Sequence, residues 1–244
     1  MIIGIDCGNS YIKIGLFKEK IIKQVVKFPV EDINKFRIPY HWKKLNIEVI
    51  ALASVSPINS DKIKTTFSSF FNKKVITITS QQCNIPLNIK DKKKVGVDRV
   101  LNCKGASVLY GNPSIVIDIG TAITIDFVNR NGVFEGGIIF PGPFLLLNSL
   151  NKTSLIKSPN FLKKNILIGK NTDECITSGL NNGIVGCIEN IVKKIKNTHK
   201  NSNVILTGGW CDYFAKKIKI KKIVKKNLTL EGINIVIRER WLKK

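Results

Sequence analysis

The chain has 244 residues, of which 43% are hydrophobic, so it can bury a substantial core as one large domain or two small ones. It carries 40 basic and 17 acidic residues, a formal net charge of +23. No apolar run reaches the ~18 residues of a membrane span, and the N-terminus lacks the basic region of a signal peptide. The six cysteines form no C-x-x-C pair and there are two histidines, which indicates neither a zinc site nor a disulfide framework. These features predict a reduced, cytoplasmic protein.

The large positive charge suggests nucleic-acid binding, but its distribution argues against that class. Arginine occurs at five positions only, and the lysines are spread along the chain, with short runs at 92–94, 216–226 and the C-terminus. Nucleic-acid binding needs basic or aromatic residues gathered on one face. We interpret the lysines as a solvated surface whose positive field attracts anionic substrates.

The first half of the chain alternates predicted strands and helices. Residues 2–17 predict two strands joined by a polar turn. Ser56 is expected to cap a helix that extends to about Phe71. Gly111-Asn112-Pro113 ends a helix that begins near Val95, and we place a domain boundary after residue 112. The other expected elements are strands at 21–28, 49–53 and 75–79, a mixed helix and loop at 31–45, and a polar connector at 81–94.

The second half, residues 113–244, opens with Ile115–Asp126, where two apolar stretches flank a turn and predict another hairpin. The clearest helix covers Thr172 to about Lys196, because apolar residues recur every three or four positions after a cap at Asn171. The other expected elements are a strand from 132 to 142, a helix at 143–156, a strand at 204–206, a turn into a helix at 207–209 and a strand near 221–224. Alternation in both halves predicts an α/β fold with mixed sheets.

The two predicted hairpins share one plan. Superposing Asp6 on Asp118 aligns a glycine in each turn and places Asn9 on Thr121, which suggests two copies of one supersecondary unit. Two such turns facing each other across a cleft would offer N–H groups to phosphate oxygens and carboxylates to Mg²⁺. The pair predicts a site for a metal-bound nucleotide polyphosphate. The alternative is that each Asp and Gly serves only its own turn.

Asp98 and Arg99 stand at the predicted start of a helix. An Asp in this position often serves only as a cap. An arginine beside it can bind a carboxylate or phosphate through two N–H groups, so the pair suits a substrate with an alcohol at one end and an acid elsewhere. Gly208-Gly209 adds a turn where backbone can approach a nucleotide, although an ordinary strand–helix turn uses the same residues.

Six stretches follow one another along nearly the whole chain. They are Asp6-Cys7-Gly8-Asn9-Ser10-Tyr11-Ile12-Lys13, Gly96-Val97-Asp98-Arg99, 118–126, 136–142, 168–172 and Thr207-Gly208-Gly209. This ordered set resembles the type III pantothenate kinases of the acetate and sugar kinase/Hsp70/actin superfamily. The resemblance implies two ribonuclease H-like (actin-like ATPase) domains, duplicated, with mixed sheets and flanking helices. It also implies ATP-dependent phosphorylation of pantothenate to 4'-phosphopantothenate, the first step of coenzyme A biosynthesis.

The resemblance further implies roles for the residues that match its motifs. Asp98 would be the base that takes the proton of the primary hydroxyl. Asp118 would bind a monovalent cation, K⁺ or NH₄⁺, and Asp6 would lie near the Mg²⁺ of Mg-ATP. Thr172 would reach pantothenate from the partner subunit, in a homodimer with its active site at the interface. The implied ATP-binding residues are Asp6, Cys7, Gly8, Asn9, Ser10, Tyr11, Ile12, Lys13 and Thr121, and the implied substrate-binding residues are Gly96, Val97, Asp98, Arg99 and Thr172.

Two departures from the family pattern concern the substrate pocket. The family usually has a tyrosine seven residues before the Gly of its Gly-x-Asp-Arg motif, and Ile89 occupies that place here. Lys92–Lys94 replace the usual Asn-Pro and acidic residues. A kinase for another small alcohol therefore stays an alternative, since fold alone does not fix the substrate. A second alternative is a transcriptional accessory protein that binds nucleic acid with a degenerate kinase fold, which the intact Asp6, Asp98 and Asp118 disfavour.

Overall fold

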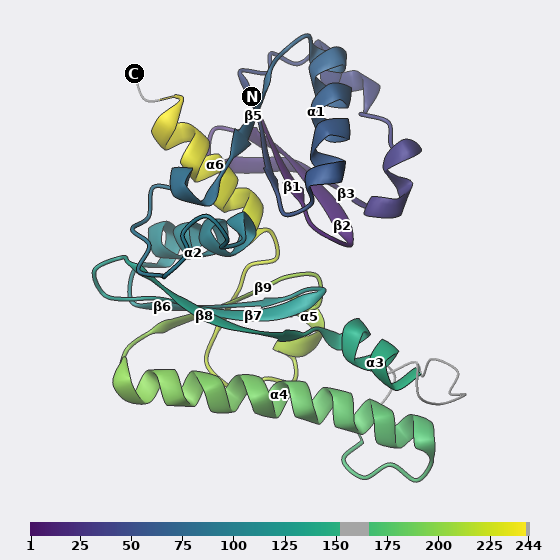
Figure 1. Ribbon diagram of the computed structural model, residues 1–244, viewed down its shortest axis with the longest axis vertical. Helices are drawn as coiled ribbons and strands as arrows, with labels where there is room; N and C mark the ends of the chain where they lie inside the picture. The colour runs from purple at the N-terminus through teal and green to yellow at the C-terminus, as the bar shows by residue number, and fades with distance from the viewer. Residues whose placement is uncertain (152–165, 243–244) are drawn as a thin grey trace.

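The structure, a computed structural model, describes residues 1–151 and 166–242, and its strands form two five-stranded mixed sheets (Figure 1). The first sheet has the order β3 (Ile21–Pro29), β2 (Tyr11–Lys18), β1 (Ile2–Cys7), β4 (Val49–Ser54) and β5 (Val75–Ile78). The second has the order β8 (Phe134–Pro141), β7 (Ala122–Val128), β6 (Ser114–Ile119), β9 (Asn203–Thr207) and β10 (Ile223–Val224). In both sheets the first three strands pair antiparallel and the remaining two pair in parallel. This repetition confirms the predicted duplication.

The helices form layers around the two sheets. They are α1 (Pro57–Phe71), α2 (Val97–Tyr110), α3 (Pro143–Asn151), α4 (Thr172–Thr198), α5 (Cys211–Ala215) and α6 (Leu228–Arg240). Short 3₁₀ turns occur at η1 (Val30–Asn34), η2 (Tyr40–Lys44) and η3 (Ser80–Gln82). Figure 1 shows α2 and α6 between the sheets, and α4 along the far face of the second sheet. Helix α1 packs on the far face of the first sheet.

Alternation along β1 and β6 decides which side chains point between the sheets. Successive side chains of a strand point to opposite faces. The odd-numbered residues of β1 pack with α1, and those of β6 pack with α4. The even-numbered side chains therefore face α2, and they include Asp6 and Asp118, each the next-to-last residue of its strand.

Helices α2 and α6 cross closely. A Cβ on Gly232 of α6 would clash with the backbone of Leu101 in α2, so only glycine allows this approach. Lys104 of α2 pairs with Glu239 of α6 at 2.9 Å, and both side chains are largely buried. This contact ties the C-terminal helix to the helix that carries Asp98.

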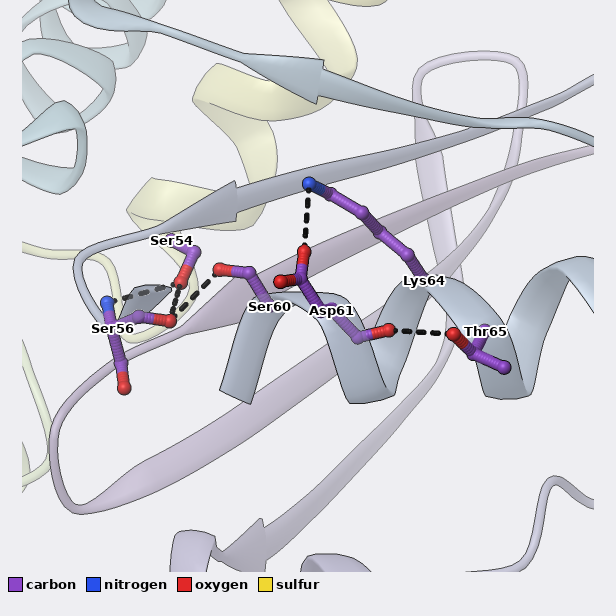
Figure 2. Close-up of polar contacts among 6 residues, drawn as sticks. All are labelled: Ser54, Ser56, Ser60, Asp61, Lys64 and Thr65. Atoms are coloured by element: carbon purple, nitrogen blue, oxygen red, sulfur yellow. Dashed lines mark hydrogen bonds and ion pairs between the residues drawn. The ribbon is translucent and has the colours of Figure 1, made fainter. Parts of the chain in front are cut away.

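Serine hydroxyls organise the loop between β4 and α1 (Figure 2). The Ser56 backbone N–H donates to Ser54 Oγ at 3.0 Å, and Ser54 Oγ donates to the Ser56 carbonyl at 2.9 Å. Ser60 Oγ donates to the same carbonyl at 2.8 Å. Ser56 occupies the N-cap position, as predicted, but its side chain accepts no backbone hydrogen bond. The neighbouring serines therefore supply most of the polar contacts at this end of α1.

Most of the elements expected from the sequence are present, and three differ. Residues 31–45 contain the 3₁₀ turns η1 and η2 rather than a longer helix. The helix expected at 143–156 is seen as α3, and residues 152–156 lie outside the described residues. Helix α6 was not predicted. Its sequence contains Gly232 and several β-branched residues, and both its flanks are buried, so it lacks the one-sided apolar pattern of a surface helix.

The boundary after residue 112 stays a proposal. It separates the strands of the first sheet from those of the second, while α6, from the end of the chain, packs against the first sheet. Within the described ranges, no helix is both long and apolar enough to cross a membrane.

Candidate active site

The turns that follow β1 and β6 meet each other. Gly8 N–H donates to the Tyr11 carbonyl at 3.1 Å, and Gly120 N–H donates to the Ala122 carbonyl at 3.0 Å. The hydroxyls of Ser10 and Thr121 are hydrogen-bonded at 2.7 Å. We call residues 8–10 and 120–121 the turn junction. The structure thus brings together the two loops that the sequence comparison paired.

Three aspartates gather behind the turn junction. Asp6 and Asp118 are the next-to-last residues of β1 and β6 and lie on the face toward α2, and Asp98 lies in the first turn of α2. The pKa of Asp6 is raised to about 7, mainly by burial and also by the charges of Asp98 and Asp118, while the charge of Lys13 opposes the rise. Burial likewise raises the pKa of Asp118 to about 6. The three carboxylates are thus close enough to repel each other, and a cation among them would favour their charged forms.

Asp98 is half-buried at the N-terminus of α2. One of its carboxylate oxygens accepts a hydrogen bond from the Arg99 backbone N–H at 2.9 Å. Burial raises the pKa of Asp98, and this hydrogen bond and the Arg99 charge oppose the rise. A carboxylate with a raised pKa is a stronger base than an ordinary Asp, which suits proton removal from an alcohol.

Arg99 has a partner that the sequence analysis missed. Its guanidinium donates from Nε to Asp126 Oδ1 at 3.0 Å and makes a further short contact from the terminal nitrogen Nη2. Asp126, on β7, is only 1% exposed. A buried acid in an apolar strand was the available signal, because such a group needs a cation nearby. The pair holds the guanidinium beside Asp98, with Nη1 making no hydrogen bond to Asp126.

Two lysines lie in register with Asp6 on the next two strands of the first sheet. Asp6 lies opposite Lys13 in the β1–β2 register, and Lys13 lies opposite Lys27 in the β2–β3 register. The Lys27 ammonium lies 3.8 Å from the centroid of the Tyr11 ring. Burial, with the charges of Lys13 and Lys226, lowers the pKa of Lys27. This concentration of positive charge favours an anion beside the first turn.

Gly208 brings the end of β9 against the second turn. Its φ is +96°, and a Cβ at this position would clash with Asp118 Oδ1 and with the backbone of Ile119. Trp210 N–H donates to the Ile119 carbonyl at 3.0 Å. Gly208 therefore allows the backbone to approach the Asp118 carboxylate closely, and the approach of a nucleotide to this turn stays a prediction.

The remaining residues that the sequence singled out fall into three groups. The side chains of Cys7 and Ile12 are in the core with α1, so only their backbone is available to a ligand. Asn9, Ser10 and Tyr11 are exposed at the first turn. Gly96 and Val97 begin α2 beside Asp98, and Ile89 packs against Gly136.

Thr172 is separate from this group within one chain. It is the first residue of α4 and is exposed. Helix α4 covers the face of the second sheet opposite α2. One chain therefore does not bring Thr172 and Asp98 together across the sheet.

The described residues contain no preformed cluster of metal ligands. Within 1–151 and 166–242, no three His, Cys, Asp or Glu side chains are close enough to hold a metal ion by themselves. Cation binding at Asp6 or Asp118 would therefore need additional oxygen atoms from backbone, water or a phosphate ligand.

Comparisons with known proteins identify the family of this chain. The family model "Type III pantothenate kinase" matches residues 2–194. A type III pantothenate kinase of Persephonella marina is 34% identical and one of Sulfurihydrogenibium sp. is 30% identical, each over 96% of this chain and at least 96% of the relative.

Two solved structures share the fold. One from Campylobacter jejuni, named for the Baf family of transcriptional activators, has a TM-score of 0.66 at 19% identity and covers 97% of this chain and 98% of its own. The activator of 2-hydroxyisocaproyl-CoA dehydratase from Clostridium difficile, with bound ADPNP, has a TM-score of 0.60 at 13% identity, covering 100% and 98%. At such identities the likeness concerns the fold, which is actin-like. The matched family model and the full-length relatives show that the chain belongs to the type III pantothenate kinase family.

Proposed function

We infer that the chain, as a member of this family, phosphorylates pantothenate with ATP as donor, in coenzyme A biosynthesis. The observation that carries the assignment of the site is the turn junction, with Asp6, Asp98 and Asp118 behind it. Phosphoryl transfer depends mainly on positioning and charge neutralisation. The turns and lysines can position phosphates, and the carboxylates can hold cations and take a proton.

We propose that the ATP phosphates bind at the turn junction. The N–H groups of residues 8–13 and the hydroxyls of Ser10 and Thr121 would contact phosphate oxygens, and Lys13 would neutralise charge. In the structure these two hydroxyls bind each other, so each has a polar group that a phosphate oxygen can replace. The C. difficile protein of the same fold holds ADPNP, which supports nucleotide binding by this architecture.

Asp98 is proposed as the base and Arg99 as the residue that holds the acidic end of pantothenate, with Gly96 and Val97 lining the same pocket. The Arg99–Asp126 pair fixes the guanidinium beside Asp98 and leaves Nη1 for the substrate carboxylate. A base of this type contributes on the order of 10²–10⁴-fold to the rate.

The donor atoms present fit the implied cations. Mg²⁺ and K⁺ take oxygen ligands, and Asp6 and Asp118 are carboxylates whose pKa burial raises, so a cation would recover their charged forms. We propose that Asp6 faces the Mg²⁺ of Mg-ATP and that Asp118 binds K⁺ or NH₄⁺. These ions would supply charge neutralisation for the phosphates.

We propose a homodimer in which Thr172 completes the partner's site. Exposed apolar side chains occur on β8, on α3 and in the segment before α4: Ile138, Ile139, Leu145, Leu150, Leu167 and Ile168. Exposed apolar side chains in this number are typical of an interface. The six free cysteines support a cytoplasmic location for this enzyme.

Two alternatives stay in the test. The same site could phosphorylate another small alcohol, because Ile89 stands where the family usually has a tyrosine. The likeness to the C. jejuni structure concerns the fold only and does not favour nucleic-acid binding here.

The test is an ADP-release assay with ATP and Mg²⁺, with and without pantothenate, in K⁺ and then in Na⁺. Pantothenate-dependent ADP release that collapses in Na⁺ supports both the activity and the cation. An Asp98→Asn variant is the control for contaminating kinases. ADP release that does not depend on pantothenate, from folded protein, would contradict the proposal and direct the search to other alcohols.

A further inference from the structure

Asp118 is held by a buried series of hydrogen-bonded side chains from two helices, α2 and α6. Asn102, on α2, donates from Nδ2 to Asp118 Oδ2 at 2.8 Å. Thr229, on α6, donates from Oγ1 to Asn102 Oδ1 at 2.9 Å. Asn102 is 1% exposed and Thr229 is 5% exposed. The C-terminal helix α6 is therefore linked to the second hairpin through Asn102 of α2.

The hydrogen bonds that join Thr229, Asn102 and Asp118 run in one direction, from the hydroxyl and the amide toward the carboxylate, when Asp118 is charged. An amide oxygen can only accept, so the Thr229 hydroxyl must donate to it. The amide nitrogen of Asn102 is then turned to Asp118, where it donates to a carboxylate. The opposite orientation of the amide would place its oxygen against the carboxylate oxygen, which is repulsive. The charged Asp118 thus fixes the orientation of the Asn102 amide, and the Thr229 hydroxyl supports that orientation by donating to the amide oxygen.

The second oxygen of Asp118 has a different environment. Oδ1 lies against Gly208 and near Gly120, at positions where side chains are absent. One carboxylate oxygen is therefore bound by Asn102, while the other faces the backbone of the two turns. A carboxylate held in this way has a fixed plane and presents a single oxygen toward the turn junction.

We propose that Asn102 and Thr229 are positioning residues, which orient Asp118 so that Oδ1 is available to the monovalent cation. This inference rests on the proposed function, since it concerns the residue assigned to that ion. Partners that orient a metal ligand change metal affinity by about 10–100-fold when they are removed. It also gives α6 a role in the reaction, although α6 packs against the first sheet.

The test compares Thr229→Val, Thr229→Ser and Asn102→Leu with the wild-type protein. The first measurement is the K⁺ concentration that gives half-maximal activation. We expect it to rise about 10-fold or more in Asn102→Leu, to rise in Thr229→Val, and to return toward the wild-type value in Thr229→Ser. The second measurement, which needs no turnover, is the K⁺-induced increase in melting temperature relative to Na⁺, with an unreactive ATP analogue present. This increase should shrink in the same order.

Asn234→Leu is the matched control. Asn234 is a buried asparagine on the same helix as Thr229, 2% exposed, and it binds the Glu19 carbonyl at 3.0 Å, away from Asp118. It should lower stability without changing the response to K⁺. If Thr229→Val and Asn102→Leu also lower stability while the K⁺ response is unchanged, the positioning role is wrong and the proposed function stands. If the wild-type protein turns over pantothenate with no response to K⁺ in either measurement, the cation assignment of Asp118 fails together with this inference.

Discussion

Asp6→Asn is expected to stabilise the ligand-free protein at neutral and higher pH while it abolishes activity. Burial, with the charges of Asp98 and Asp118, raises the pKa of Asp6 from 3.8 to about 7. The folded protein therefore keeps a proton that the unfolded chain has released. As pH rises from the unfolded pKa through the folded pKa, the free energy of unfolding falls, because a charge must be held in a site that disfavours it.

The magnitude follows from the size of this interval. One proton changes the free energy of unfolding by about 1.4 kcal/mol per pH unit. Between pH 5 and pH 7 this amounts to about 3 kcal/mol, and water at a half-buried carboxylate reduces it, so we expect about 1.5–3 kcal/mol. For a chain of this size that corresponds to about 3–12 °C in melting temperature. The neutral side chain of the Asp6→Asn variant removes the dependence.

The assay is denaturation of both proteins without nucleotide at pH 5 and pH 8. The stability of Asp6→Asn relative to the wild type should increase with pH by the amount given above. The control is Asp61→Asn, because the Asp61 side chain is 86% exposed and pairs with Lys64 on α1 (Figure 2); its effect should not change with pH in this direction. If Asp6→Asn changes the free energy of unfolding equally at both pH values, the idea that burial raises the pKa of Asp6 in the ligand-free site is refuted.

Three further predictions concern other parts of the site. Asp98→Asn should lower kcat by about 10²–10⁴-fold, while ATP affinity measured by calorimetry stays near that of the wild type. Because burial raises the pKa of Asp98, kcat/KM of the wild type should fall on acidification at a higher pH than an ordinary Asp would give. Gly208→Ala should cost about 1–3 kcal/mol of stability from its positive φ and should also weaken ATP binding, whereas Gly132→Ala, with φ of +74° and no contact with Asp118, should affect stability alone. Ile139→Asp, at a side chain 58% exposed on β8, should convert dimer to monomer in size-exclusion chromatography with loss of activity, while Ile58→Asp on α1, 89% exposed, should not; a chain that is monomeric and active from the start would refute the shared site.

Patterns in short stretches of the sequence were sufficient to predict the two hairpins and α4. In each hairpin, apolar runs flank a short polar turn with an Asp and a Gly, so the pattern is contained within about 15 residues. The duplication was visible for the same reason, because both copies keep the order of Asp and Gly. Helix α4 was visible because one face is apolar and the other is solvated.

Helix α6 could not be recognised in this way. Its residues pack against both the first sheet and α2, so the apolar pattern has no single face. The partners of the site residues were equally hidden: Asp126 follows Arg99 by 27 residues, and Thr229 follows Asn102 by 127. Nothing in a local window relates such pairs.

By itself, then, the sequence determined the α/β class, the two turns and the family resemblance, because these depend on residues that are neighbours along the chain. Only the tertiary structure decided that Asp6, Asp98 and Asp118 share one region, that Arg99 is held by Asp126, and that hydrogen bonds through Asn102 link Asp118 to Thr229 of α6. The physical reason is strand alternation: one face of β1 and one face of β6 both look toward α2, and residues far apart in the chain become partners only when that helix lies between the two sheets.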